Sequence, residues 1–360
     1  MTVAVAMAAV MMIRGSSSFS LRTTRTYRRS ISAISSIHGN NIRRCMSAVS
    51  STGDNNIGLL ETLGSWKAHG GWWTRYAHAS TSTKGRMTFS VFVPPNASAK
   101  NPAPVVFYLS GLTCTDENVV HKAGASRAAS QSGVSLVCPD TSPRGAGVEG
   151  EDDGWDFGTG AGFYVDATRE PWKSGGYAME TYIATELRGM FTSPNDEHLQ
   201  LFPALDGSRV SVMGHSMGGH GALTLAFKRP EWWKSVSAFS PICHPTNCPW
   251  GIKAFTGYFA GGVEEGKGHD ATCLVHAASR AGSLDALPPV LVDQGLSDSF
   301  FAPSQDNGPE GQLQPGALEK ALQDHPSSVV RLHDGYDHSY HFISTFIDDH
   351  VEFHAMHLKK

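Results

Sequence analysis

The chain has 360 residues, of which 40% are hydrophobic and 17% charged, and its formal net charge is −4. This composition is ordinary for a globular protein, and the absence of bulk basicity argues against nucleic acid or an anionic membrane as the main partner. No apolar run approaches the roughly 18–20 residues that span a bilayer, so we expect no membrane segment. The length allows one large domain or two ordinary ones.

The cysteines are expected to be free thiols in a reducing compartment, because a chain of this length can build its core without disulfides. No Cys-x-x-Cys pair is present, so the sequence does not indicate a structural zinc site. The cysteines are Cys45, Cys114, Cys138, Cys243, Cys248 and Cys273.

The first part of the chain differs from the rest. Residues 1–53 contain no Asp or Glu but seven arginines among many serines. This composition is typical of an organellar transit peptide, and it does not separate mitochondrion from plastid. The alternative is a disordered extension of a cytoplasmic protein, with Met46 as a second start. We therefore predict that residues 1–55 precede a single catalytic domain at 56–360.

From about residue 60, short apolar runs rich in β-branched residues alternate with helical patterns. In chain order, we predict strands at 87–93, 105–109 and 134–138, a helix at 178–191, a strand at 210–213, a helix at 219–228, strands at 236–239 and 290–292, a helix at 317–323, a strand at 329–332 and a helix at 340–358. Such runs suit strands buried on both faces. The alternation predicts one α/β domain with a mainly parallel sheet and helices on both sides.

One serine lies in a pattern with chemical meaning. Residues 214–218 read Gly-His-Ser-Met-Gly between the predicted strand 210–213 and the following helix. Gly-x-Ser-x-Gly at a strand-to-helix turn is typical of the nucleophile of an α/β-hydrolase, and it makes Ser216 the candidate. A match to so short a motif arises easily by chance, and the alternative is a helix N-cap serine in a tight turn.

A serine nucleophile needs a histidine base and an orienting carboxylate, which follow it in the chain in this fold. Two carboxylates compete for the acid: Asp293 at the end of strand 290–292, and Asp298 in the loop beyond it. We favour Asp298, because a loop residue reaches a histidine more easily, and Asp293 then anchors the turn.

Histidines follow the last predicted strand at three positions. We favour His338 as the base, because it comes after Gly335 in a loop that enters the final helix. His333 continues the strand and is expected to be structural. His338 and His341 could instead be metal ligands, but no third ligand of matching spacing is evident, so we expect no metal.

An oxyanion hole requires two backbone N–H groups. In this fold, one belongs to the residue after the nucleophile, here Met217, and the other to the loop after an earlier strand, here residues 110–112.

Several segments together resemble one family, S-formylglutathione hydrolase, also called esterase D. The resemblance covers roughly residue 58 to the end and rests on residues 109–115, 155–168, 214–221, 293–295 and 335–340. The stretch 155–168, which begins Trp-Asp-Phe-Gly-Thr-Gly, is highly specific. The resemblance implies hydrolysis of S-formylglutathione to formate and glutathione without a cofactor, by a homodimer.

The same resemblance implies roles for particular residues. It gives Ser216, Asp298 and His338 as the triad, the N–H groups of Leu112 and Met217 as oxyanion donors, and Cys114 as a thiol near the active site. The alternative for Cys114 is a packed core thiol. Segment 301–315 looks longer than the family's loop, and we expect it to bulge at the surface beside the acid.

Two other function classes remain open on the sequence. One is a broader carboxylesterase or an acyltransferase that uses the same triad. The other is a catalytically silent hydrolase-fold binding protein, although all three triad residues are present. The Gly-rich run 158–162 lacks both the P-loop ending and the Rossmann spacing, which argues against a nucleotide site.

Overall fold

The computed structural model describes residues 60–192 and 201–359. Within this part of the chain, nine strands form one sheet in the order β1-β2-β3-β5-β4-β6-β7-β8-β9. Their bounds are β1 Glu61–Ala68, β2 Gly71–Ala79, β3 Arg86–Val93, β4 Ala103–Leu109, β5 Ser135–Pro139, β6 Leu205–His215, β7 Val236–Phe239, β8 Val290–Gly295 and β9 Ser328–His333. Strands β4 to β9 pair in parallel, and β1 to β3 add an antiparallel edge.

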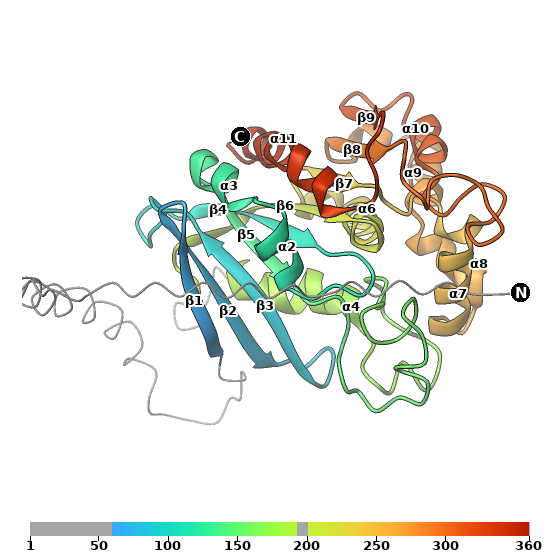
Figure 1. The fold of residues 1–360 in the computed structure, drawn as a ribbon, viewed down its shortest axis with the longest axis horizontal. Helices are drawn as coiled ribbons and strands as arrows, with labels where there is room; N and C mark the ends of the chain where they lie inside the picture. The colour runs from blue at the N-terminus through green and yellow to red at the C-terminus, as the bar shows by residue number, and fades with distance from the viewer. Residues whose placement is uncertain (1–59, 193–200, 360) are drawn as a thin grey trace, which may run out of the picture. The chain divides into compact units, whose positions relative to one another are not determined.

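Helices cover both faces of this sheet (Figure 1). The α-helices are α2 Glu117–Lys122, α3 Ser126–Ser132, α4 Met179–Thr181, α5 Arg188–Thr192, α6 Met217–Lys228, α7 Pro249–Tyr258, α8 Gly262–Gly266, α9 Ala271–Arg280, α10 Pro315–Ala321 and α11 Tyr340–Leu358. A π-helical segment, η1 Tyr182–Leu187, joins α4 to α5. The 3-10 turns are η2 Pro230–Trp232, η3 Pro245–Asn247, η4 Lys267–His269 and η5 Leu284–Ala286.

Strand β4 shows how the core divides. Val105 and Phe107 belong to the larger cluster, which includes residues of α6, α7 and α9, whereas Val106 and Tyr108 belong to the cluster under α3 and α11. Side chains alternate between the two faces of a strand, so a continuous apolar run fills both cores. The prediction of an α/β-hydrolase fold with helices on both faces is confirmed.

The seven predicted strands are all present, and the structure adds β1 and β2 at the antiparallel edge. It also adds α2, α3 and the group α7 to α9, while the helix predicted at 178–191 is interrupted by η1. The five cysteines of the described residues are free thiols, as expected, and Cys45 lies outside those residues. No helix in the described part of the chain combines the length and apolarity that a membrane span requires.

Segment 301–315 only partly fits the expected surface bulge. Residues 302–306 are exposed, but residues 311–315 are buried. The N–H of Cys243 donates to the carbonyl of Leu313 (2.8 Å), and the side chain of Gln312 accepts from the N–H of Trp250 (3.1 Å). The expectation was wrong for this second half, because its backbone and side chains hydrogen-bond to the segment after β7 and to the start of α7.

Candidate active site

Ser216 occupies the turn between β6 and α6 in a strained conformation. Its φ and ψ are 57° and −120°, and a positive φ is rare for a residue with a side chain. The turn is held by hydrogen bonds from the Ser216 N–H to the carbonyl of Phe239 (2.9 Å) and from the His220 N–H to the Ser216 carbonyl (3.0 Å). Backbone strain of this kind persists where the surrounding structure fixes it, and it is typical of nucleophile turns.

Close packing of the backbone explains why the motif has glycines at positions 214 and 218. A Cβ on Gly214 would collide with the backbone of Gly218, and a Cβ on Gly218 would collide with the carbonyl of Leu109. The missing side chain of Gly214 lets strand β6 approach the start of α6, and the missing side chain of Gly218 lets α6 approach the end of β4. The result places the Ser216 side chain at the carboxyl end of the parallel strands, where ligands bind in open α/β sheets.

Asp298 and His338 meet at the ends of two neighbouring strands. Oδ2 of Asp298, in the loop after β8, lies 2.5 Å from Nδ1 of His338, in the loop after β9. The Asp298 carboxylate also accepts from the Phe300 N–H (2.9 Å) and from Nε2 of Gln294 (3.3 Å), and its residue is 2% exposed. A buried carboxylate held by three donors fixes the imidazole and directs its proton-accepting role to Nε2.

The ring of His338 lies against the serine turn. Its centroid is 4.5 Å from that of His215, the residue directly before Ser216, and 4.9 Å from that of Phe300. Burial lowers the pKa of His215 well below its usual value, and the neighbouring His338 contributes a smaller lowering. His215 is therefore a neutral packing partner, and His338 is the ring that hydrogen-bonds to a carboxylate.

The loop after β4 provides the other side of the site. A Cβ on Gly111 would lie 3.1 Å from the Ser216 Cβ, so this loop passes directly over the nucleophile turn. Within residues 60–192 and 201–359, neither the Leu112 N–H nor the Met217 N–H has a protein acceptor. Two unpaired donors beside a strained serine are what an oxyanion hole requires.

The stretch 155–168 holds that loop in place. The Thr113 N–H donates to the Gly160 carbonyl (2.9 Å), and the Tyr164 hydroxyl donates to the Ser110 carbonyl (2.8 Å). Thr113 has a φ of 66°, so the loop turns sharply just after Leu112. The distinctive sequence of this stretch is thus explained by its support of the segment that carries a candidate oxyanion donor.

Cys114 follows the loop that passes over the serine turn, and its N–H donates to the Gly111 carbonyl (3.3 Å). Its carbonyl accepts from the Thr141 hydroxyl (2.6 Å), and its side chain is half-buried. Burial raises the pKa of its thiol, and a hydrogen bond with Tyr340 acts in the opposite direction. A thiol of raised pKa stays protonated near neutral pH, so Cys114 is a neighbour of the site with no evident nucleophilic role.

The other sequence candidates lie elsewhere. Asp293 is buried between Arg331, whose guanidinium lies 2.6 Å away, and His350 at 3.3 Å. Burial alone would raise the pKa of Asp293, but these partners hold it below its usual value. His333 packs against Phe346, and His341 is exposed on α11. The geometry therefore separates Asp298 and His338 from their competitors.

One feature of the site was not predicted. A row of aromatic rings leads away from His338: Phe300 lies 4.7 Å from Trp250, and Trp250 lies 5.7 Å from Trp155, which is 54% exposed. Trp155, Trp250 and Phe300 lie 95 and 50 residues apart in the chain, so no local pattern could reveal the row.

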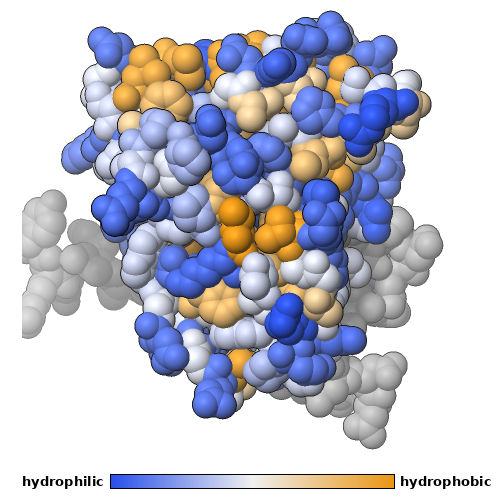
Figure 2. All heavy atoms as spheres, turned by 90° about the vertical axis from the view of Figure 1, so that its right-hand side faces the viewer, coloured by the Kyte–Doolittle hydropathy of each residue, from blue (hydrophilic) through white to orange (hydrophobic). Residues whose placement is uncertain are grey.

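Helix α7 also lines an open hollow on the protein surface, formed by Phe157, Pro249, Ile252, Lys253, Thr256 and Gly257. Figure 2 views the molecule from the side on which Figure 1 shows α7 and α8. Hydrophobic residues gather near the centre of that face, with hydrophilic residues around them. The face of the molecule that includes α7 is thus partly apolar.

The parallel sheet and the strained Gly-x-Ser-x-Gly turn define a protein of the α/β-hydrolase class. The family model described as "Putative esterase" matches residues 80–353. The chain belongs to the S-formylglutathione hydrolase family. It is 46% identical over 301 residues to S-formylglutathione hydrolase of Arabidopsis thaliana, covering 83% of this chain and 98% of the relative. The enzyme of Rattus norvegicus is also 46% identical over 301 residues, covering 83% and 99%.

A solved structure agrees with this assignment. The S-formylglutathione hydrolase of Agrobacterium tumefaciens is 44% identical, with a TM-score of 0.73 over 82% of this chain and 99% of the other. The serine hydrolase FphF of Staphylococcus aureus is 16% identical, with a TM-score of 0.59 over 79% of this chain and 98% of the other. The second likeness concerns the fold alone.

Proposed function

We propose that this protein hydrolyses S-formylglutathione to formate and glutathione through Ser216, Asp298 and His338. The observation that carries the proposal is the buried Asp298–His338 hydrogen bond beside the strained Ser216 turn, in a chain of this family. The class of reaction is acyl transfer to a serine hydroxyl and then to water.

His338 accepts the Ser216 proton as the hydroxyl oxygen attacks the formyl carbonyl, and Asp298 stabilises the resulting imidazolium. The tetrahedral intermediate collapses by breaking its carbon–sulfur bond, and glutathione leaves as thiolate or as thiol after protonation by His338. Water then attacks the formyl-enzyme with His338 as base, which releases formate and restores the serine. These steps require no metal or organic cofactor.

The developing negative charge is assigned to the N–H groups of Leu112 and Met217. Both lack a protein acceptor within the described residues and flank the serine turn. Removal of one such donor typically costs about 3 kcal/mol of transition-state stabilisation. The contacts of Thr113 and Tyr164 with their neighbours thus support catalysis indirectly, by holding the loop that carries Leu112.

Cellular placement and assembly are further parts of the proposal. Residues 1–55 are proposed as a transit peptide for a mitochondrion or plastid, with the cytoplasm as the alternative location. They lie outside the described residues, which begin at residue 60. Residues 56–360 are proposed as the single catalytic domain, which the compact unit at 57–360 supports. We also propose a homodimer, by likeness to the family. Fluorescent fusions of the full chain and of a chain without residues 1–55 would separate the locations.

The substrate assignment is tested by comparing kcat/KM for S-formylglutathione and for a simple aryl acetate with the same enzyme preparation. We expect thioester turnover far above ester turnover. Comparable or higher ester turnover would move the protein to the alternative of a broad carboxylesterase. Transfer of the formyl group to an added alcohol or amine in preference to water would identify an acyltransferase. Absence of turnover with every acyl donor would indicate a silent binding protein.

A further inference from the structure

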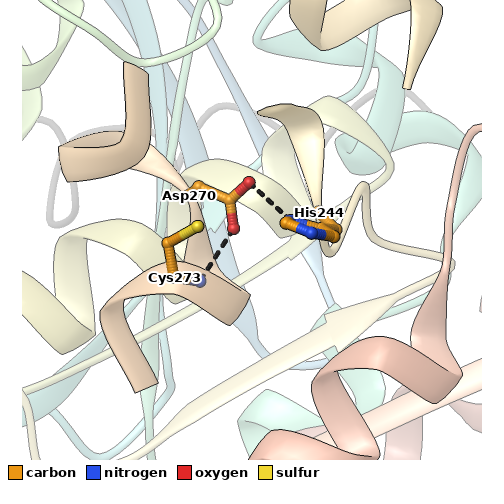
Figure 3. A group of neighbouring side chains, drawn as sticks. All are labelled: His244, Asp270 and Cys273. Carbon is orange, nitrogen blue, oxygen red and sulfur yellow. Dashed lines mark hydrogen bonds and ion pairs between the residues drawn. The ribbon is translucent and has the colours of Figure 1, made fainter. Parts of the chain in front are cut away.

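A second group of reactive side chains lies away from the triad, at the junction of the segment after β7 with α9. It consists of His244, Asp270 and Cys273, named here the 244–273 cluster (Figure 3). One potential ligand atom from each residue lies within 4.8 Å of the other two. His244 comes from the loop after β7, Asp270 is the N-cap of α9, and Cys273 is in the first turn of that helix.

The contacts within the cluster orient its donors. Oδ2 of Asp270 accepts from Nδ1 of His244 (2.8 Å) and from the hydroxyl of Thr246 (2.7 Å), while Oδ1 accepts from the Cys273 N–H (3.0 Å). The Asp270 side chain is fully buried, the His244 side chain is 24% exposed, and Cys273 is half-buried. The cluster is therefore preorganised by a buried carboxylate and still open to solvent.

The thiol is the group that the helix cap does not explain. Within the cluster, the Cys273 thiol has a hydrogen bond with the His244 side chain, and its sulfur lies 3.9 Å from the Thr246 hydroxyl oxygen. An Asp–His ion pair and a capped helix would be complete without it. A sulfur, an imidazole nitrogen and a carboxylate oxygen that converge on one point form the mixed donor set that zinc prefers.

We propose that His244, Asp270 and Cys273 bind one zinc ion, with water or the Thr246 hydroxyl as the fourth ligand. Zinc–nitrogen and zinc–oxygen bonds of about 2.0–2.1 Å place two tetrahedral ligands about 3.3 Å apart. The present His244 Nδ1–Asp270 Oδ2 separation of 2.8 Å must therefore widen by about half an ångström, a shift that the partly exposed His244 side chain permits. Zinc replaces the imidazole Nδ1 proton and the thiol proton, which are released to solvent.

The position of the cluster gives zinc a structural consequence. The Ile242 N–H donates to the Ser216 carbonyl (3.4 Å), and the Thr272 hydroxyl donates to the Cys243 carbonyl (2.8 Å). The segment after β7 therefore lies between the serine turn and α9. Zinc at the cluster would cross-link that segment to α9 and raise the thermal stability of the domain, while leaving the triad itself untouched.

The test uses full-length protein prepared free of metal and titrated with Co²⁺ and then with Zn²⁺. We expect one Co²⁺ per chain with a thiolate-to-metal charge-transfer band, displacement of Co²⁺ by Zn²⁺, and a higher unfolding temperature with Zn²⁺. Cys273→Ser should abolish the band and weaken Zn²⁺ binding by at least about 100-fold, since loss of even a supporting contact costs 10–100-fold. His244→Ala should weaken binding comparably.

The matched control is Cys114→Ser, because Cys114 is the other half-buried thiol of the described residues. Cys45→Ser serves the same purpose for the N-terminal thiol. Both controls should keep the charge-transfer band. Cys273→Ser should fold normally, since Asp270 caps the backbone N–H of residue 273 and not its side chain.

Absence of stoichiometric binding by the wild type would overturn the proposal. A band that persists in Cys273→Ser, or one that disappears in Cys114→Ser or Cys45→Ser, would do the same. Thioester turnover by Cys273→Ser is measured in parallel. Metal binding tests the zinc site and turnover tests the proposed function, so failure of one proposal is distinguished from failure of the other.

Discussion

Replacement of Asp298 by Asn tests the assignment of the acid, because three donors converge on its carboxylate. His338 Nδ1, the Phe300 N–H and Gln294 Nε2 all point at oxygens of Asp298. An asparagine offers one oxygen and one NH2 group, so at least one donor would face another donor. If the amide oxygen still accepts from the Phe300 N–H, the amide NH2 group faces Nδ1 of His338. The ring then carries its proton on Nε2, which can no longer accept the Ser216 proton.

The expected effect on catalysis is large. In a serine protease, the equivalent change from carboxylate to amide preserves geometry and lowers kcat by about 10⁴-fold, which corresponds to about 5.5 kcal/mol. We expect Asp298→Asn to lower kcat for S-formylglutathione by roughly that factor. Its circular dichroism spectrum should match that of the wild type. The assay is steady-state hydrolysis followed by the release of free glutathione thiol.

Asp293→Asn is the matched control, because Asp293 competes with Asp298 on sequence alone. Asp293 pairs with Arg331 and His350, so its loss leaves the Arg331 guanidinium without its buried partner. We expect a loss of about 3 kcal/mol in the free energy of unfolding, with kcat near the wild-type value at temperatures where the variant is folded. Inactivity of folded Asp293→Asn together with retained activity of Asp298→Asn would refute the assignment of Asp298 as the acid.

Three further predictions concern other parts of the domain. Gly218→Ala should lower both the unfolding temperature and kcat, because the added Cβ would collide with the carbonyl of Leu109 at the end of β4. Thermal unfolding and steady-state kinetics of the variant check this. Alkylation of Cys114 by a bulky maleimide should inhibit the wild type, whereas Cys114→Ser should retain turnover and resist the maleimide. Inhibition of Cys114→Ser to the same extent would be the contrary outcome. Burial alone would raise the pKa of Glu180, but hydrogen bonds with His269 and Lys228 lower it to about 2. Because that pKa is depressed on folding, its stabilisation is present above about pH 4.5 and is lost as pH falls toward 2. Urea unfolding from pH 7 to pH 3 should show this loss, and Glu180→Gln should reduce the slope.

The parallel half of the sheet could be predicted from sequence because its strands are buried on both faces. Strand β1 escaped prediction since nearly all of its residues are exposed, including Trp66, and an exposed edge strand carries no hydrophobic period. The helix predicted at 178–191 has the right extent, but hydrogen-bond spacing changes at η1, which apolar periodicity does not report.

The candidate site divides in the same way. The turn that carries Ser216 could be predicted, because its motif is local and fixes the backbone geometry. The choice between Asp293 and Asp298 depended on which loop reaches His338, and the structure places Asp298 there. The row from Phe300 through Trp250 to Trp155 depends on tertiary packing, as does the 244–273 cluster, so their chain spacing carried no signal.

The central claim is that Ser216 is the nucleophile for S-formylglutathione, and kcat/KM of Ser216→Ala tests it most directly. The variant should fold as the wild type does and lose at least about 10⁴-fold in kcat/KM, since the remaining binding and oxyanion groups supply only a small part of triad catalysis. Thioester hydrolysis by folded Ser216→Ala at a rate close to that of the wild type would contradict the account.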